Sequence, residues 1–343
     1  MTTMEDFYDS IKNTRRILIE AKLTPLQGDR FQPTGFPYLG AAEYTSPDGK
    51  EMLLVESTQS MANRMEAVCW DEENKNLVDE LKGLPYIKVS LQDGSFTTSL
   101  HESHRIGSGR ITKKDATKED MIYKELESSF GNGDRPIDYK RLAKILLKYD
   151  PNSLIHGVWI TGGSDSEKGK IGGGKLRIQR SISGFIEATN FQRAVSGGTK
   201  KDYVNPSLEG GAGNVPFSRT EYVAERIIAY FNVDLTQIRS FSLPTNAQKL
   251  LITLSLYKMY KFLQEEIKLR TACDLKVNGN LKANDEQIGI ISLPDIRSIK
   301  DEIGKLIQQC ALEKLFADPY ITELTYKESK KAKDSKKETT EEE

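Results

Sequence analysis

The stretch RRILIEAKL, residues 15–23, indicates the fold most directly. Ile17, Ile19 and Ala21 alternate with other residues, a spacing of two that predicts a β-strand with one face in a core. Further along the chain, KLRIQRSISGFIEATNF (175–191) alternates in the same way and predicts a half-exposed strand. Both segments are therefore predicted to be strands with one face against a core.

Helical periodicity occurs between and after these strands. Met61, Met65 and Val68 share one helical face behind the polar residues 57–60. The same spacing predicts helices over 118–130, 138–149, 219–231, 246–269 and 295–316, and apolar runs predict strands at 82–91 and 154–160. We expect an α+β fold, compatible with a ferredoxin-like sheet that carries large insertions.

Domain organisation follows from composition. Glycine-rich stretches at 162–174 and 196–213 predict flexible surface loops. We expect one elaborated domain over residues 1–327, with insertions at about 90–130 and 162–213. Residues 328–343 are charged and almost without apolar side chains, so we expect a disordered tail.

Several classes of protein are disfavoured. The cysteines at 69, 273 and 310 are too few and too far apart for a disulfide framework, which indicates a reducing compartment. The longest apolar stretch is far shorter than the ~20 residues that span a bilayer. We expect a cytoplasmic protein with no membrane partner.

Charge is unevenly distributed along the chain. Residues 101–201 carry 19 Lys and Arg against 12 Asp and Glu, a net charge of +7, whereas the whole protein has a net charge of -1. A surface that binds a nucleic-acid backbone would produce this excess, because each Lys or Arg over a phosphate releases condensed counterions. A chance excess on a solvated face is the alternative interpretation.

Two motifs suggest enzymes, and neither is complete. GKIGGGKL (169–176) nearly matches a phosphate-binding loop, but Leu176 stands where Ser or Thr would hold Mg²⁺ and a strand follows instead of a helix. His101 and His104 have a metal-ligand spacing without a nearby third ligand. We therefore expect no catalytic residues, no metal and no cofactor, and a flexible basic loop around Lys170 and Lys175.

The loop at 30–36 has the composition of a single-strand binding site. Arg30 stands beside Phe31 and Phe36, and bases stack on aromatic rings while a cation neutralises phosphate. Phenylalanines that fill the core are an equally simple interpretation. No RNP-type aromatic motif occurs in the strands, so ordinary RRM recognition is not indicated.

Three strings together resemble a known family: LTPLQGDRFQPTGFPYLGAAEY (23–44), LLVESTQSMANRMEAVCWD (53–71) and SLHESHRIGSGRI (99–111). They are similar to the large backbone subunit of type I-G (formerly type I-U) CRISPR complexes, a RAMP-superfamily protein of the Cas-seven family. The clear resemblance covers about the first third of the chain. Beyond it, length, helix order and glycine-rich loops are similar.

The resemblance implies a hand-like subunit with an RRM-like (ferredoxin-like) palm and inserted fingers and thumb. It implies binding to crRNA, polymerisation with other copies along the guide, and contact with other Cascade subunits and the target DNA strand. It also implies R-loop formation and a recruited helicase-nuclease, with guide–target pairing carrying the sequence specificity in antiviral defence.

Candidate RNA-binding residues come from two sources. The polar and cationic side chains in the resembling strings are Arg30, Gln32, Asn63, Arg64, His104 and Arg105. Charge alone adds Lys170, Lys175, Arg177 and Arg180. A surface ion pair is the alternative for any one arginine.

Two enzyme hypotheses stay open beside this one. Related type III backbone subunits cleave target RNA with a loop aspartate, and Asp29 lies in a suitable early loop. A metal-dependent RNase is therefore the alternative function. A nucleotide-binding enzyme would need Lys175 in its loop, and the missing Ser or Thr disfavours it.

Overall fold

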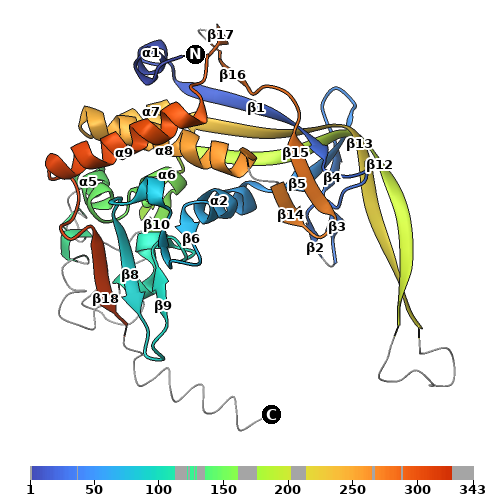
Figure 1. Ribbon diagram of the computed structural model, residues 1–343, viewed down its shortest axis with the longest axis horizontal. Coiled ribbons are helices and arrows are strands. Elements are labelled where there is room, and N and C mark those ends of the chain that lie inside the picture. The colour runs from blue at the N-terminus through green and yellow to red at the C-terminus, as the bar shows by residue number, and fades with distance from the viewer. Residues whose placement is uncertain are drawn as a thin grey trace.

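The main sheet of the computed structural model brings together strands from the whole length of the chain (Figure 1). The structure describes residues 2–36, 38–112, 122, 124–126, 128–129, 136–160, 176–201, 214–264, 267–286 and 289–326. The strands of this sheet are β1 (Arg16–Pro25), β4 (Glu43–Thr45), β5 (Glu51–Glu56), β12 (Ile182–Lys201), β13 (Asn214–Asp234), β14 (Ile267–Arg270), β15 (Cys273–Val277), β16 (Lys282–Asp285) and β17 (Gly289–Ile290).

The strand order is β14-β15-β1-β13-β12-β5-β4, with β16 paired to β1 and to β17. β1 is antiparallel to both β13 and β15, and β12 is antiparallel to β13. The predicted strand at 15–23 is confirmed, because Ile17, Ile19 and Ala21 are buried as the alternation requires. Burying each of these isoleucines contributes about 1.5–3 kcal/mol relative to leaving it exposed.

The helices are α1 (Met4–Ser10), α2 (Thr58–Ala67), α3 (Gly109–Thr112), α5 (Tyr139–Tyr149), α6 (Pro151–His156), α7 (Leu235–Ser240), α8 (Thr245–Gln264) and α9 (Ile296–Leu312). The predictions at 138–149 and 295–316 are confirmed, as is the helix around Met61 and Met65. The helix predicted at 246–269 is confirmed as far as Gln264, whereas residues 267–269 belong to β14. α2 contacts β12, and α8 contacts β13, β14, β15 and α2, so α2 and α8 pack against the main sheet. α9 packs on the outside of α8, away from the sheet.

Smaller sheets surround this centre. They are β2 (Gly35–Phe36) with β3 (Gly40–Ala41), β6 (Trp70–Asp71) with β7 (Asn76–Leu77), β10 (Val158–Ile160) with β11 (Leu176–Ile178), and β8 (Tyr86–Ser90) between β9 (Phe96–Thr98) and β18 (Ile321–Thr325). Two 3₁₀ turns, η1 (Asp79–Leu81) and η2 (Arg105–Gly107), complete the described elements.

β12 and β13 form a hairpin that extends far beyond the sheet. β5 pairs with Ile186–Thr189 and β1 with residues 227–234. The hairpin continues outward from the pair Phe191↔Ala224 to the pair Lys201↔Asn214. We call residues 191–201 and 214–224 the arm, which leaves the body as a two-stranded ribbon (Figure 1).

Three sequence predictions were wrong in this region. Residues 219–231 are strand and not helix, because Ile227, Ala229 and Phe231 alternate into the core between β1 and β12. Residues 196–201 continue β12 instead of forming a loop. Residues 182–190 belong to the main sheet, so they are not part of an insertion.

The strand predicted at 154–160 is only partly correct. Pro151 begins the short helix α6, and Gly157, with φ of +79°, ends it before β10 starts at Val158. A continuous strand is not compatible with this left-handed residue, which glycine adopts readily. The strand predicted at 175–191 is likewise interrupted between Ile178 and Ile182.

Two further findings concern the cysteines and membrane-spanning helices. The free cysteines 69, 273 and 310 are all buried. Among the described residues, no helix is long and apolar enough to cross a membrane. The predicted charged tail and parts of both predicted insertions, including the helix at 118–130 for the most part, lie outside the described residues.

Candidate nucleic-acid interface

A groove of about 590 Å³ lies where the start of α2 meets β10, β11 and the ends of β1, β12 and β13. We call it the α2 groove. It is lined by four arginines, Arg16, Arg105, Arg177 and Arg180, and among its described lining residues Asp234 is the one carboxylate. Its charge therefore suits a polyanion.

The β10–β11 sheet supplies a cation and an aromatic ring side by side. Leu176 and Ile178 are buried, so the alternation of the strand turns Arg177 outward. Arg177 is the cross-strand partner of Trp159, which is 44% exposed. An exposed indole beside a guanidinium offers one surface for base stacking and one charge for phosphate.

Arg180 lies at the N-terminus of α2. Ser57 caps this helix by accepting a hydrogen bond from the Ser60 amide, and Arg180 Nη1 donates to the Thr58 carbonyl at 3.2 Å. Burial lowers the pKa of Arg180 from its usual value, and the neighbouring Arg105 and Arg177 lower it further. A bound anion would relieve this repulsion, and the N-terminal amides of a helix favour anions as well.

Arg105 forms part of the floor of the groove. Its Nε and Nη2 donate to the two carboxylate oxygens of Glu66, each at 2.7 Å, and its Nη1 donates to the Gly157 carbonyl at 3.1 Å. Asn152 Nδ2 donates to the same carboxylate at 2.6 Å. This guanidinium is therefore held by the protein itself, which argues against the predicted guide contact.

Beneath the groove the polar network continues into the core. Lys258, which is buried, donates to Asn152 Oδ1 and lies 2.9 Å from His156 Nε2. Burial first, and then the cations Lys258, Arg105 and Arg180, hold the pKa of His156 well below its usual value. His156 is therefore a neutral core residue at the end of α6.

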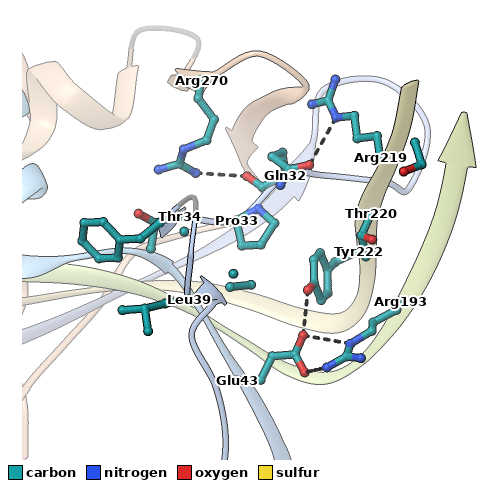
Figure 2. A pocket seen from close by; sticks show the side chains of 15 residues that line it. Gln32, Pro33, Thr34, Leu39, Glu43, Arg193, Arg219, Thr220, Tyr222 and Arg270 are labelled. Carbon is teal, nitrogen blue, oxygen red and sulfur yellow. Dashed lines mark hydrogen bonds and ion pairs between the residues drawn. The ribbon is translucent and has the colours of Figure 1, made fainter. Parts of the chain in front are cut away.

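A second hollow, of about 910 Å³, lies at the base of the arm (Figure 2). We call it the arm-base hollow. Arg193, Arg219 and Arg270 line it from β12, β13 and β14, and Figure 2 shows Glu43 and Tyr222 beside Arg193. Phe36, which is 69% exposed, and Leu39, which is 81% exposed, add apolar surface from the β2–β3 hairpin.

The cations of the arm-base hollow already have protein partners. Arg193 pairs with Glu43, which also accepts from Tyr222 Oη at 2.6 Å, and the pKa of Glu43 is lowered by Arg193 first. Arg270 pairs with Glu56 and donates to the Gln32 carbonyl at 3.0 Å. This hollow is therefore closer to charge balance than the α2 groove.

A family model matches the chain. The model of the CRISPR-associated protein GSU0053 family covers residues 17–193, just over half of the 343 residues. The chain belongs to this family. Membership confirms the resemblance to a CRISPR-associated RAMP-superfamily subunit of the Cas-seven family, whereas type I-G stays a prediction. No curated protein matches the chain significantly.

Solved structures add weak likenesses to this member of the GSU0053 family. A chain of a CRISPR RNA-guided surveillance complex in a pre-nicking state is 10% identical, with 87% of this chain and 89% of that chain covered and a TM-score of 0.38. Csc2 of Thermofilum pendens is 11% identical, with 88% and 76% covered and a TM-score of 0.30. Both are too distant to add to the family assignment.

The structure distributes the predicted site residues of this family member over several places. His104, Arg177 and Arg180 line the α2 groove beside Arg105. Gln32 lines the arm-base hollow, and Arg30 lies near it in an ion pair with Glu221 at 3.1 Å. RNA binding by any of them is untested and stays a prediction.

The remaining predicted residues lie elsewhere. Asn63 is exposed on α2, whereas Arg64 is half-buried, with its Nη1 donating to the Lys268 carbonyl at 3.3 Å and its Nε 3.3 Å from Glu56. That internal role makes Arg64 a weaker candidate. Lys170 and Lys175 lie outside the described residues.

The lining residues of the α2 groove that the sequence did not single out include Arg16, Gln59 and Trp159. Arg16 begins the strand used to indicate the fold, and Gln59 stands in one of the family-like strings, so both were visible but unassigned. Trp159 carried no periodic signal, because only pairing with Arg177 across the β10–β11 sheet shows that it faces outward.

The metal hypothesis for His101 and His104 finds no support in geometry. His101 Nδ1 lies 2.8 Å from Thr98 Oγ1, and its ring stands edge-on to Trp70. In the part of the chain that the structure describes, no three His, Cys, Asp or Glu residues are grouped as metal ligands. Asp29 is exposed in the loop after β1.

Proposed function

We propose that this chain is a crRNA-binding backbone subunit of a type I-G CRISPR Cascade surveillance complex, which polymerises along the guide and supports R-loop formation in antiviral defence. It works by holding RNA rather than by catalysis. Membership of a CRISPR-associated family supports the setting. The observation that carries the proposal is the α2 groove, where Arg177, Arg180 and Trp159 meet the start of α2.

Two arginines and one indole ring would hold a single strand in the α2 groove. Arg177 and Arg180 supply charge without a carboxylate partner among the described residues, unlike Arg16 with Asp234 and Arg105 with Glu66. The exposed ring of Trp159 offers a stacking surface that any base can use. Such a groove tracks backbone and stacks bases without reading sequence, which leaves specificity to guide–target pairing.

Strand order supports an RRM-like palm. β1, α2, β12, β13, α8 and β15 follow one another in the chain, and their strands lie in the order β15-β1-β13-β12. This is the ferredoxin-like βαββαβ order, in which the last strand and the third strand flank the first. The segments between these elements would then be the inserted fingers.

The arm is the best candidate for the thumb. It is the extension of the hairpin formed by β12 and β13, the second and third palm strands along the chain, and it carries the exposed side chains of Val195 and Phe217. In this proposal its partners are the guide and a neighbouring copy, with the target DNA strand, the other Cascade subunits and a helicase-nuclease completing the assembly.

Salt dependence tests the groove. Single-stranded RNA should bind with an affinity that falls steeply as salt rises. The logarithm of the binding constant should fall by about 0.7 per phosphate contact for each tenfold increase in salt concentration. We expect the double variant Arg177→Ala, Arg180→Ala to weaken binding by about an order of magnitude and to flatten the slope by about 1.4, measured by fluorescence anisotropy over a salt series.

The matched control is Arg297→Ala, because Arg297 is an exposed arginine on α9. It should leave both affinity and slope unchanged. Equal effects of the two variants would refute the groove as the binding site. Recovered RNA should stay intact in Mg²⁺, and shortening that depends on Asp29 would favour the RNase alternative instead.

A further inference from the structure

Two uncharged polar side chains of the main sheet, Ser183 and Asn232, line the α2 groove together with its four arginines. Ser183 on β12 and Asn232 on β13 are cross-strand partners. Side chains directly opposite each other in an antiparallel pair have Cβ atoms about 4.5–5.5 Å apart, so both can reach one group of a ligand. We call them the Ser183–Asn232 pair.

Strand alternation turns this pair away from the helices of the core. Phe231 and Val233, on either side of Asn232, are buried, and the Phe231 ring lies 6.3 Å from that of Phe262 on α8. Asn232 itself is partly exposed. Because neighbouring residues of a strand point to opposite faces, Asn232 lies on the face of β13 opposite α8.

The Asn232 amide has an unused hydrogen-bond acceptor. Its Oδ1 atom is buried and has no hydrogen-bond partner among the described residues. Most buried polar atoms in folded proteins have a partner, so this oxygen requires an explanation. The terminal torsion of asparagine is soft, which lets the amide turn its oxygen toward a molecule in the groove.

A second polar atom of the groove lining is also unmatched. His156 is 1% exposed and lines the groove, and its Nε2 lies 2.9 Å from Lys258 Nζ. An ammonium only donates, so Nε2 accepts and the hydrogen of the neutral ring is on Nδ1. Nδ1 has no partner in the described part of the chain. Unmatched atoms on two elements indicate a groove that a polar ligand completes.

The chemistry of a single RNA strand limits which group can pair with Asn232 Oδ1. Phosphate oxygens only accept hydrogen bonds, so they do not satisfy an acceptor. Base N–H groups differ from one base to the next. The 2′-hydroxyl is present on every nucleotide and both donates and accepts. It is therefore the one donor that a strand of any sequence supplies at each step.

We propose that the Ser183–Asn232 pair binds a ribose 2′-hydroxyl of the strand in the α2 groove and so selects RNA over DNA. The hydroxyl donates to Asn232 Oδ1 and accepts from Ser183 Oγ. This site depends on the proposed function, because that function places the strand. Recognition of the sugar reads no base, which leaves sequence specificity to guide–target pairing.

The test compares three oligomers of equal length by fluorescence anisotropy on the full chain: oligo(U), oligo(dU) and 2′-fluoro-oligo(U). The last keeps an RNA-like sugar pucker but lacks the hydroxyl donor. We expect oligo(U) to bind about tenfold more tightly than either of the others, because only its hydroxyl satisfies the buried acceptor.

Variants locate the effect. Asn232→Leu, which is close in size, should bring the affinity ratio between oligo(U) and oligo(dU) close to one with an unchanged salt slope. Ser183→Ala should reduce the ratio. The matched control is Asn284→Leu, because Asn284 is an exposed asparagine on β16 that faces Leu18 of β1 from the other side. It should keep the full ratio.

The outcomes separate this site from the proposed function. Equal affinities for the three oligomers with a steep salt slope would overturn the hydroxyl site and leave RNA binding standing. Tight binding of 2′-fluoro-oligo(U), or a ratio that survives both Asn232→Leu and Ser183→Ala, would overturn it as well. Absence of salt-dependent binding to oligo(U) would overturn the proposed function itself. Ser183→Ala is a small change, so it reports on the site even if Asn232→Leu unfolds the chain.

Discussion

Arg105 shows at the residue scale how a cation in a family-like string acquires a structural role. Arg105 is 9% exposed, and its guanidinium holds Glu66 through two hydrogen bonds. The pair links α2 to the η2 turn, and through Asn152 and Lys258 it reaches α6 and α8. The pair therefore links the elements that form the walls of the α2 groove.

Arg105→Ala should reduce the free energy of unfolding by about 3–5 kcal/mol, because it leaves the buried carboxylate of Glu66 without its cation. Urea unfolding followed by circular dichroism measures this. The control is Arg193→Ala, whose pair with Glu43 is largely exposed and should cost no more than about 1 kcal/mol. A similar loss in both variants would contradict the buried role.

Asp150 gives the molecule a predictable pH dependence. Burial raises its pKa to about 6, although Ser153 Oγ donates to the carboxylate at 2.7 Å. An unfolded aspartate titrates near 3.9, so the folded state binds this proton more tightly. Its stabilisation is complete below about pH 4 and is lost as the pH rises through 6.

We therefore expect Asp150→Asn to be more stable than the natural chain at pH 8, by up to about 3 kcal/mol, and similar to it at pH 4. The amide stays neutral and can still accept from Ser153. Urea unfolding at the two pH values is the measurement. The same difference at both would show that ionisation of Asp150 does not contribute.

At the scale of elements, the junction between α6 and β10 controls the shape of the α2 groove. Gly157 has a φ of +79°, and a Cβ added there would lie 2.7 Å from the Ile178 carbonyl oxygen. The atoms nearest to this Cβ are all backbone atoms, so they cannot move aside as the end of a flexible side chain can. The close approach brings β11, and with it Arg177, against α6.

Gly157→Ala should therefore destabilise the fold by about 1–3 kcal/mol and weaken RNA binding through displaced β11. Thermal unfolding and anisotropy measure the two effects. Gly304→Ala is the matched control, because Gly304 lies inside α9 with open space around it, and alanine there should stabilise the helix by up to about 1 kcal/mol. If Gly157→Ala changed neither thermal stability nor RNA binding, this account of the junction would be wrong.

At the scale of the whole molecule, the arm is a structure without its own core. Val195 is 80% exposed and Phe217 is 55% exposed on a ribbon that the main sheet does not cover. No contact within the described part of the chain explains why the arm is so long. A contact that repeats between neighbouring copies would explain its length. Head-to-tail contacts of this kind produce open assemblies.

Shortening the arm should separate RNA binding from assembly. Replacing residues 195–220 with an Asn-Gly turn keeps the last pair, Ala194↔Glu221, in a two-residue hairpin. We expect this variant to keep the salt-dependent binding of a short RNA by the α2 groove but to lose multi-copy complexes on a full guide, measured by native mass spectrometry. Complexes of normal size would show that the arm is dispensable for polymerisation.

The sequence by itself determined the elements whose patterns are local. The alternation in 15–23 predicted β1, and apolar spacing predicted α2, α5, α8 and α9, because burial of one face suffices for each. The family-like strings correctly indicated a CRISPR-associated protein. His104, Arg177 and Arg180 were also named before the structure placed them in one groove.

Tertiary structure decided the rest. Residues 219–231 have apolar positions that fit both a helix and a strand, and pairing with β1 and β12 selected the strand. Spacing cannot show that Arg105 would meet Glu66, or that Trp159 would face Arg177, because each contact depends on elements brought together across the chain. Which arginines are left without a carboxylate partner is therefore a property of the folded molecule.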